Sequence, residues 1–536
     1  MIRRALTCLV VVALSILYLQ SNQGIANHYL NGSYFSTSPS QATNAGDYYQ
    51  RIEMDKAWQI STGSSSVSVG IIDTGFVPTD PRLQGNIDTS LSYDFCDQNR
   101  GPFSNINLYH GTEVASRLGG NGNSGLYSSG VVKESNLIAL RVDDINFPHN
   151  ENLLAVAYAL FYAQMYNVPI VNFSGGFYES DIDFISKNIL QAAVNQYSGL
   201  IVCAAGNGNE NTSNPEMYNI DSDEHKLYPA CFTNDNILVV GGTMENSDEL
   251  NNGKTNYGTT SVDLFAPGGD GTSLATPLVA GTAALMLSVN PNLTTVQLKQ
   301  KILSNVDYIQ GYENYCVSHG RLNVLKSLLA ALPAIGEGTT TSLNQIEYGN
   351  FQWYRFISGY GIYSFETTGS LDTVGSLYYN NLSGLIETSS SGGSGNNFSF
   401  TCPLSPGAYY LKIGLNSYSL PGYYNITISN HPHLYNDHYS SAGFSGHKCH
   451  CLCGDYEIKP HVFPTDINGN RLPCVVCGFS LGGGILSIEN GAFFGNGSFV
   501  YEDGTICLSH DDYIWIMHSD FFKGVETWNG LLDFLL

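Results

Sequence analysis

Basic residues are scarce in this chain. It has 22 Lys and Arg against 46 Asp and Glu, which gives a formal net charge of −24. A surface this negative repels phosphate backbones, so the charge argues against a nucleic-acid partner. It suits instead a soluble protein whose carboxylates can bind cations.

Long hydrophobic runs are also missing after the N-terminus, so we expect no stable membrane insertion of the mature chain. The 536 residues are 43% hydrophobic, enough to bury cores of ordinary size. This excludes a disordered or collagen-like chain. The length predicts two to four domains.

The N-terminus has the pattern of a secretory signal. Arg3 and Arg4 precede the uncharged apolar run Ala5–Leu19, whose 15 residues are fewer than the roughly 20 that span a bilayer. We therefore predict a signal peptide over residues 1–26 and a secreted, extracellular protein, with an uncleaved membrane anchor as the alternative. Residues 27–46 are then a short pro-segment or linker.

Residues 47–333 alternate short apolar runs with two segments of helical periodicity, at 152–166 and 181–197. Strands that alternate with helices predict an α/β fold, a parallel sheet with helices on both faces. Functional residues then gather at the carboxyl ends of the strands. The expected strands are Val67–Ile72, Leu137–Leu140, Ile170–Phe173, Leu200–Ala204 and Ile237–Val240.

Four polar residues fall at strand ends or helix starts of this pattern. Asp73 and Asn207 each follow a predicted strand, whereas His110 and Ser273 begin segments with helical spacing. A serine becomes a good nucleophile when an imidazole removes its proton, and a carboxylate fixes the tautomer of that imidazole. An amide and a helix N-terminus can stabilise the oxyanion that forms.

The segments Ile71–Gly75, His110–Ala115, Ala204–Asn207 and Gly271–Pro277 resemble the subtilisin-like serine peptidases (subtilases), in that family's order. The resemblance covers about residues 47–333. It implies a secreted serine endopeptidase that hydrolyses protein or peptide substrates through an acyl-enzyme, with no cofactor for catalysis. By similarity, the catalytic residues are Asp73, His110 and Ser273, and Asn207 is the oxyanion-hole donor.

The resemblance also implies a substrate groove with two walls. One wall is Ser174, Gly175 and Gly176, and the opposite wall is Ala204, Ala205 and Gly206. Glycines let a peptide approach the backbone closely. The longer segment after Asn207 carries Asp221, Asp223 and Glu224, which could attract basic side chains, bind Ca²⁺ or be solvated.

After residue 333 the helical period is lost. Residues 334–430 alternate polar and apolar residues and resemble the bacterial pre-peptidase C-terminal domain, which implies a β-sandwich whose aromatic residues fill its core. A linker (431–446), a Cys/His-rich module (447–480) and a β-rich tail (481–536) complete the predicted organisation.

The Cys/His-rich module has two pairs of closely spaced cysteines, Cys451 with Cys453 and Cys474 with Cys477. Four thiolates at such spacing favour a tetrahedral structural zinc, in which His461 or Cys449 could replace one ligand. So small a module needs a metal or disulfides to fold, and in an exported protein disulfides are the alternative. A second hypothesis for the whole chain is an inactive peptidase-like adhesion or binding protein.

Overall fold

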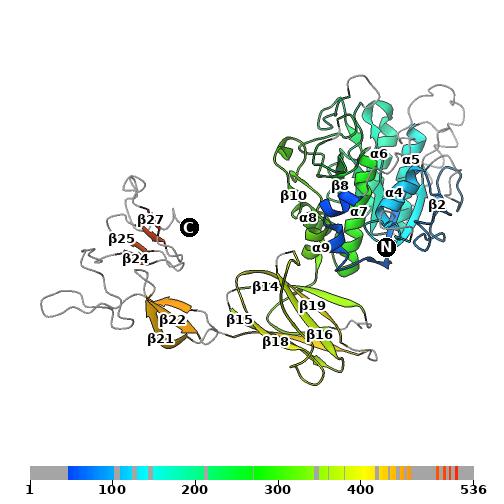
Figure 1. Ribbon diagram of the computed structural model, residues 1–536. Helices are drawn as coiled ribbons and strands as arrows, with labels where there is room; N and C mark the ends of the chain where they lie inside the picture. The colour runs from blue at the N-terminus through cyan, green and yellow to red at the C-terminus, as the bar shows by residue number, and fades with distance from the viewer. Residues whose placement is uncertain are drawn as a thin grey trace, which may run out of the picture.

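The computed structural model describes residues 46–431 except for ten short gaps, together with seven short strands beyond. The gaps are 102–108, 124–128, 143–148, 210–214, 251, 270, 343–348, 360, 380 and 417–421. Figure 1 shows an α/β domain, followed by a domain of β-strands alone.

A nine-stranded sheet forms the centre of the α/β domain. All its neighbouring strands pair in parallel except β10 and β11, and each of the five predicted strands lies in it. The strands, in sheet order, are β10 (Asp307–Tyr308), β11 (Gly320–Arg321), β9 (Leu264–Pro267), β8 (Ile237–Thr243), β6 (Leu200–Ala204), β4 (Ile170–Phe173), β1 (Gly63–Asp73), β3 (Glu134–Arg141) and β2 (Tyr93–Asp94).

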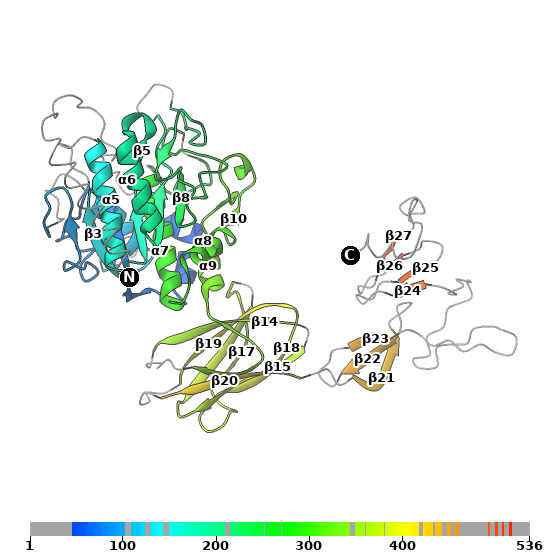
Figure 2. The ribbon, with the colours of Figure 1, turned by 180° about the vertical axis from the view of Figure 1, so that it is seen from behind.

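Helices cover both faces of this sheet, and each face has its own hydrophobic core (Figure 2). Strand β1 shows why: Ile71 and Ile72 point to opposite faces and are both fully buried. One core contains α4 (His110–Gly119), α7 (Thr272–Val289), α8 (Thr295–Leu303) and α9 (Val324–Ala331). The other contains α5 (His149–Met165) and α6 (Phe184–Gln196). The predicted α/β fold, with helices on both faces of a parallel sheet, is confirmed.

Helix α7 packs on the central strands of the sheet. It is long and apolar enough to cross a membrane, but 78% of its hydrophobic window is buried inside the protein. This helix therefore belongs to the buried core of the α/β domain. Ser273 is its second residue, so the core fixes the position of this side chain.

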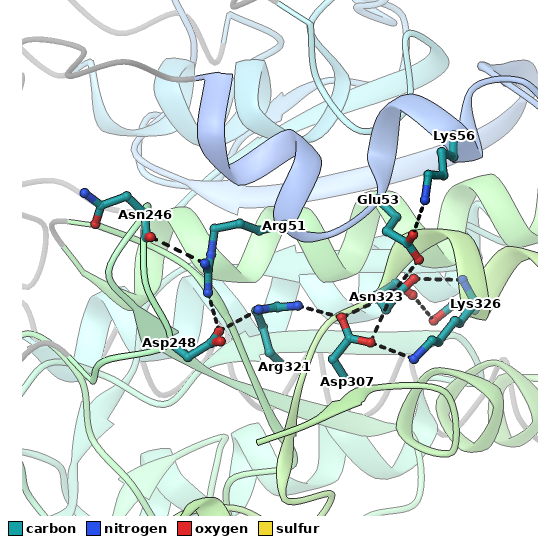
Figure 3. Close-up of polar contacts among 10 residues, drawn as sticks. Arg51, Glu53, Lys56, Asn246, Asp248, Asp307, Arg321, Asn323 and Lys326 are labelled. Carbon is teal, nitrogen blue, oxygen red and sulfur yellow. Dashed lines mark hydrogen bonds and ion pairs between the residues drawn. The ribbon is translucent and has the colours of Figure 1, made fainter. Parts of the chain in front are cut away.

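A network of charged side chains fastens the N-terminal helices α2 (Gly46–Arg51) and α3 (Met54–Ala57) to this domain (Figure 3). Arg51 and Arg321 both pair with Asp248, and Arg321 also pairs with Asp307 at 2.6 Å. Lys326 binds the other oxygen of Asp307 at 2.7 Å. Segments far apart in the sequence are thus held together at one edge of the sheet.

Arg117 ties the same N-terminal segment to the helix that begins at His110. Its guanidinium lies 4.0 Å from the ring centroid of Tyr48 and forms an ion pair with Glu245 at 2.9 Å. Because Arg117 is in the last turn of α4, these contacts fix that helix against α2.

The second domain consists of two sheets that share a hydrophobic core, as expected for a β-sandwich. The first sheet contains, in order, β12 (Ala334–Ile335), β14 (Phe351–Ser358), β19 (Gly407–Leu415), β16 (Thr373–Tyr379) and β17 (Gly384–Ser389). The second contains β13 (Gly338–Ser342), β20 (Tyr424–His431), β15 (Gly361–Gly369) and β18 (Ser399–Leu404).

Not every aromatic residue of the first sheet faces the sandwich core. Tyr354, Phe356 and Tyr409 do, but Trp353 and Tyr410 belong to a core of the α/β domain. Alternate side chains of a strand point to opposite faces, so the sheet packs on both domains at once. The two domains therefore meet through a buried apolar contact.

Two further antiparallel sheets follow. The first is three-stranded, with β21 (Tyr435–Ser441), β22 (His447–Cys451) and β23 (Tyr456–Lys459). The second is four-stranded, with β24 (Gly491–Phe493), β25 (Phe499–Tyr501), β26 (Ile506–Leu508) and β27 (Ile514–Ile516).

Candidate active site

Three neighbouring strands end at the same edge of the large sheet. The last residue pairs are Ile72 with Phe173 and Phe173 with Cys203, so the ends of β1, β4 and β6 are in register. Asp73 and Ala204 are the last residues of β1 and β6, and Ser174 directly follows β4. The predicted acid and the beginnings of both predicted substrate walls therefore lie side by side.

Asp73 and His110 are in direct contact. His110 Nδ1 lies 2.8 Å from Asp73 Oδ1, which also accepts a hydrogen bond from the backbone N–H of Thr74. The side chain of Asp73 is fully buried and that of His110 is 10% exposed. A carboxylate at Nδ1 orients the imidazole and leaves Nε2 as the nitrogen that can take a proton.

The glycine after His110 makes this contact feasible. A Cβ on Gly111 would lie only 2.3 Å from the carbonyl oxygen of Gly75 and 3.0 Å from Asp73 Oδ1. Helix α4 can approach the end of β1 this closely only with glycine at this position. This close approach is the physical reason why a glycine follows His110.

Ser273 is bound to the end of β4 by two hydrogen bonds. Its hydroxyl donates to the carbonyl of Ser174 at 3.1 Å, and the hydroxyl of Ser174 donates to the carbonyl of Ser273 at 2.9 Å. In a regular helix this carbonyl would accept the N–H of residue 277, but Pro277 has none. The proline inside α7 thus frees the carbonyl that Ser174 binds.

Asn207 follows β6 and reaches the start of α7. Its Oδ1 accepts hydrogen bonds from the backbone N–H and the hydroxyl of Thr272, both at 3.1 Å. Since Oδ1 is engaged in this way, Nδ2 is the group left to donate to a ligand. An amide donor beside a helix N-terminus is suited to stabilise a developing oxyanion.

Tyr178 and Asn256 hold the segment that carries Asn207, and no motif in the sequence points to either residue. The hydroxyl of Tyr178 donates to the carbonyl of Asn207 at 2.7 Å. Asn256 Nδ2 donates to that hydroxyl at 3.0 Å and to the carbonyl of Ala205 at 2.9 Å. Tyr178 lies in β5 (Phe177–Tyr178), which pairs with β7 (Leu227–Tyr228), and strands of two residues show no periodic pattern.

The acidic residues after Asn207 have different surroundings. Asp221 accepts hydrogen bonds from the backbone and hydroxyl groups of Thr260 and from the backbone of Ser261, so it holds that turn. The carboxylate of Asp223 is exposed and pairs with Lys226. Over the described part of the chain, no group of three His, Cys, Asp or Glu residues is placed to hold a metal ion. Ca²⁺ binding stays a prediction.

Of the predicted zinc ligands, Cys451 is the last residue of β22. Cys453, Cys474 and Cys477 lie outside the described residues. Cys203, Cys231, Cys316 and Cys402 form no disulfide.

Comparison with known proteins gives the family. The model of the Subtilase family matches residues 64–323. A thermophilic serine proteinase of Bacillus sp. (strain AK1) is 30% identical over 314 residues, which are 55% of this chain and 70% of that protein. Thermitase of Thermoactinomyces vulgaris is 27% identical over 296 residues, 52% of this chain and 94% of that protein.

Two other matches cover similar parts of the chain. The minor extracellular protease Epr of Bacillus subtilis (strain 168) is 26% identical, over 50% of this chain and 40% of that protein. The crystal structure of MycP1 from Mycobacterium smegmatis is 22% identical and matches with a TM-score of 0.45, over 55% of this chain and 88% of that chain. The family match and the 30% identity to a serine proteinase carry the assignment: this chain belongs to the subtilase family and is a subtilisin-like serine endopeptidase.

Proposed function

We propose that Ser273, His110 and Asp73 form the catalytic triad of this endopeptidase and that Asn207 is its oxyanion donor. The contact between His110 Nδ1 and Asp73 Oδ1 carries the proposal, because a buried carboxylate at Nδ1 is what a histidine base requires. The position of Ser273 also supports the proposal. Its hydroxyl donates a hydrogen bond to the carbonyl of Ser174, at the end of β4, and β4 pairs with the strand that carries Asp73.

The proposed reaction passes through an acyl-enzyme. Ser273 Oγ attacks the carbonyl carbon of the scissile bond while His110 Nε2 takes the hydroxyl proton. The carbonyl oxygen becomes negative and is stabilised by Asn207 Nδ2 and the backbone N–H of Ser273. His110 then donates the proton to the leaving amine, and water releases the acyl group by the same steps in reverse order.

Substitution of Ser273 by alanine tests this mechanism. Ser273→Ala is expected to abolish casein hydrolysis and labelling by a fluorophosphonate probe while circular dichroism stays unchanged. Ser288→Ala is the matched control, because Ser288 lies in the same helix and its hydroxyl donates to the carbonyl of Leu285. Full activity in Ser273→Ala would refute the assignment. A folded wild-type protein that is not labelled would favour the inactive binding protein instead.

We also propose that the protein is secreted after removal of residues 1–26. The N-terminal charge and hydrophobicity pattern supports this, as does the relative whose name describes it as extracellular. The full chain, expressed in a bacterium with a secretion pathway, is expected in the medium. Its first residue is expected to be Asn27, or a later residue if the short segment after residue 26 is also removed. Recovery with the membranes and an intact N-terminus would favour the anchor.

We propose a structural zinc ion for residues 447–480, held by Cys451, Cys453, Cys474 and Cys477. The support is the spacing of the cysteines, which suits tetrahedral sulfur coordination. Disulfides are the competing explanation, and zinc analysis distinguishes the two.

A further inference from the structure

A leucine side chain stands between the two walls predicted to bind substrate. A Cβ on Gly176, in the first wall, would lie 2.7 Å from Leu227 Cδ2, and a Cβ on Gly206, in the opposite wall, would lie 2.7 Å from the same atom. Leu227 is only 2% exposed. Its side chain therefore contacts both walls, and glycine at these two positions leaves room for it.

The backbone of Leu227 is held in place. Leu227 pairs with Tyr178 in the β5–β7 sheet, directly after the first wall. Beside this pair, the N–H of Glu179 donates to the carbonyl of Lys226 at 2.9 Å. Leu227 thus cannot move away from the first wall without breaking these backbone contacts.

Hydrogen bonds also join the two walls next to Leu227. The hydroxyl of Tyr178, two residues after the first wall, donates to Asn207, one residue after the opposite wall. Asn256 links that hydroxyl to the carbonyl of Ala205 in the opposite wall. These bonds oppose a separation of the walls that would admit a larger group.

We propose that Leu227 restricts the residue before the scissile bond (P1) to small side chains such as Ala, Gly or Ser. This rests on the proposed function. A carbonyl between Ser273 and Asn207 has one wall on either side, because Ser273 is bound to Ser174 and Asn207 follows Gly206. A large P1 side chain directed between the walls would need the volume that Leu227 fills.

The test measures kcat/KM on peptides that differ only at P1. The wild-type protein is expected to cleave after Ala or Ser at least about tenfold faster than after Leu or Phe, since a few carbon atoms in a filled apolar site produce such ratios. Leu227→Gly is expected to raise cleavage after Leu and Phe relative to Ala by about the same factor. Leu227→Ala, which removes less volume, is expected to fall between the two.

Leu190→Ala is the matched control. Leu190 is fully buried in α6 and belongs to the same hydrophobic core as Leu227. This variant is expected to lose stability but keep the wild-type ranking of P1 residues, so a change of ranking cannot be ascribed to a weakened core.

Several results would overturn the inference. Equal cleavage after Phe and Ala by the wild-type protein would by itself refute the role of Leu227, even if Leu227→Gly fails to fold. An unchanged ranking of P1 residues in folded Leu227→Gly and Leu227→Ala would refute it as well. Fluorophosphonate labelling of Ser273 with a broad P1 preference refutes only the role of Leu227, whereas absent labelling and no cleavage of any peptide refute the proposed function as well.

Discussion

The hydroxyl of Tyr178 donates a hydrogen bond to the backbone carbonyl of Asn207 across 2.7 Å. Burial raises the pKa of Tyr178 to about 12, although the hydrogen bond from Asn256 acts in the opposite direction. The hydroxyl therefore keeps its proton at neutral pH and remains a donor. It holds in place the peptide group of Asn207, the residue whose side chain we propose to stabilise the oxyanion.

We predict that Tyr178→Phe lowers kcat by roughly fivefold and changes KM little, because one neutral hydrogen bond contributes about 1 kcal/mol. Tyr178 acts here as a positioning residue, and the split between kcat and KM distinguishes this role from a contact with bound substrate. The measurement is steady-state hydrolysis of a peptide anilide.

Tyr197→Phe is the control for this prediction. The hydroxyl of Tyr197 also donates to a backbone carbonyl at 2.7 Å, that of Val168, but between α6 and the start of β4. It is expected to lower stability and leave kcat unchanged. A Tyr178→Phe variant with the wild-type kcat would contradict the positioning role.

We predict that Asn207→Asp lowers kcat by at least roughly 10²-fold. An aspartate keeps an oxygen for the hydrogen bonds from Thr272 but places a negative charge where the amide would donate. Asn195→Asp introduces the same change at an exposed position on α6 and is expected to leave kcat unchanged. Equal losses in both variants would indicate a general effect of charge.

The central strands could be predicted from the sequence, and the four polar motifs could be recognised in it, because each produces a strong local pattern. Buried parallel strands such as Ile170–Phe173 are continuous apolar runs, and the structure has a strand with those bounds. Leu227 and Tyr178 leave no such pattern. Their positions depend on the pairing of two short strands about 50 residues apart, and tertiary contacts decide that pairing.

The packing of Trp353 is a second feature that could not be predicted from the sequence. Its strand alternates as expected, so the aromatic residues of β14 must face two sides of the sheet. We expected them to fill the sandwich core, and Tyr354 and Phe356 do. Trp353 packs instead on the α/β domain, because another domain covers the outer face. Nothing in the local pattern of a strand specifies a partner of that kind.

We predict about one zinc ion per chain in the purified, unreduced protein, by elemental analysis. Cys474→Ser is expected to lower the zinc content and destabilise residues 447–480 toward proteolysis. Cys402→Ser is the control, because Cys402 is a buried cysteine of the β-sandwich without a disulfide. Zinc content near zero, together with loss of four free thiols on titration, would favour disulfides.

Asp307 makes the stability of the N-terminal network depend on pH. Burial alone would raise the pKa of this carboxyl, but the hydrogen bonds from Lys326 and Asn323, with the nearby charge of Arg321, outweigh it and hold the pKa below its ordinary value of 3.8. A lowered pKa in the folded state means that the ionised carboxylate stabilises the fold above about pH 4. The contribution is lost as the pH falls toward the pKa in the folded state.

We therefore predict that Asp307→Asn lowers Tm at pH 7 by roughly 2–4 °C, since solvent screening limits a partly exposed ion pair to about 1 kcal/mol. The difference is expected to shrink below about pH 4, where the wild-type carboxyl also becomes neutral. Thermal unfolding is measured in a Ser273→Ala background to prevent self-cleavage, with Asp235→Asn as the control at an exposed aspartate. A difference in Tm that stays constant from pH 7 to pH 3 would show that Asp307 acts through its shape rather than its charge.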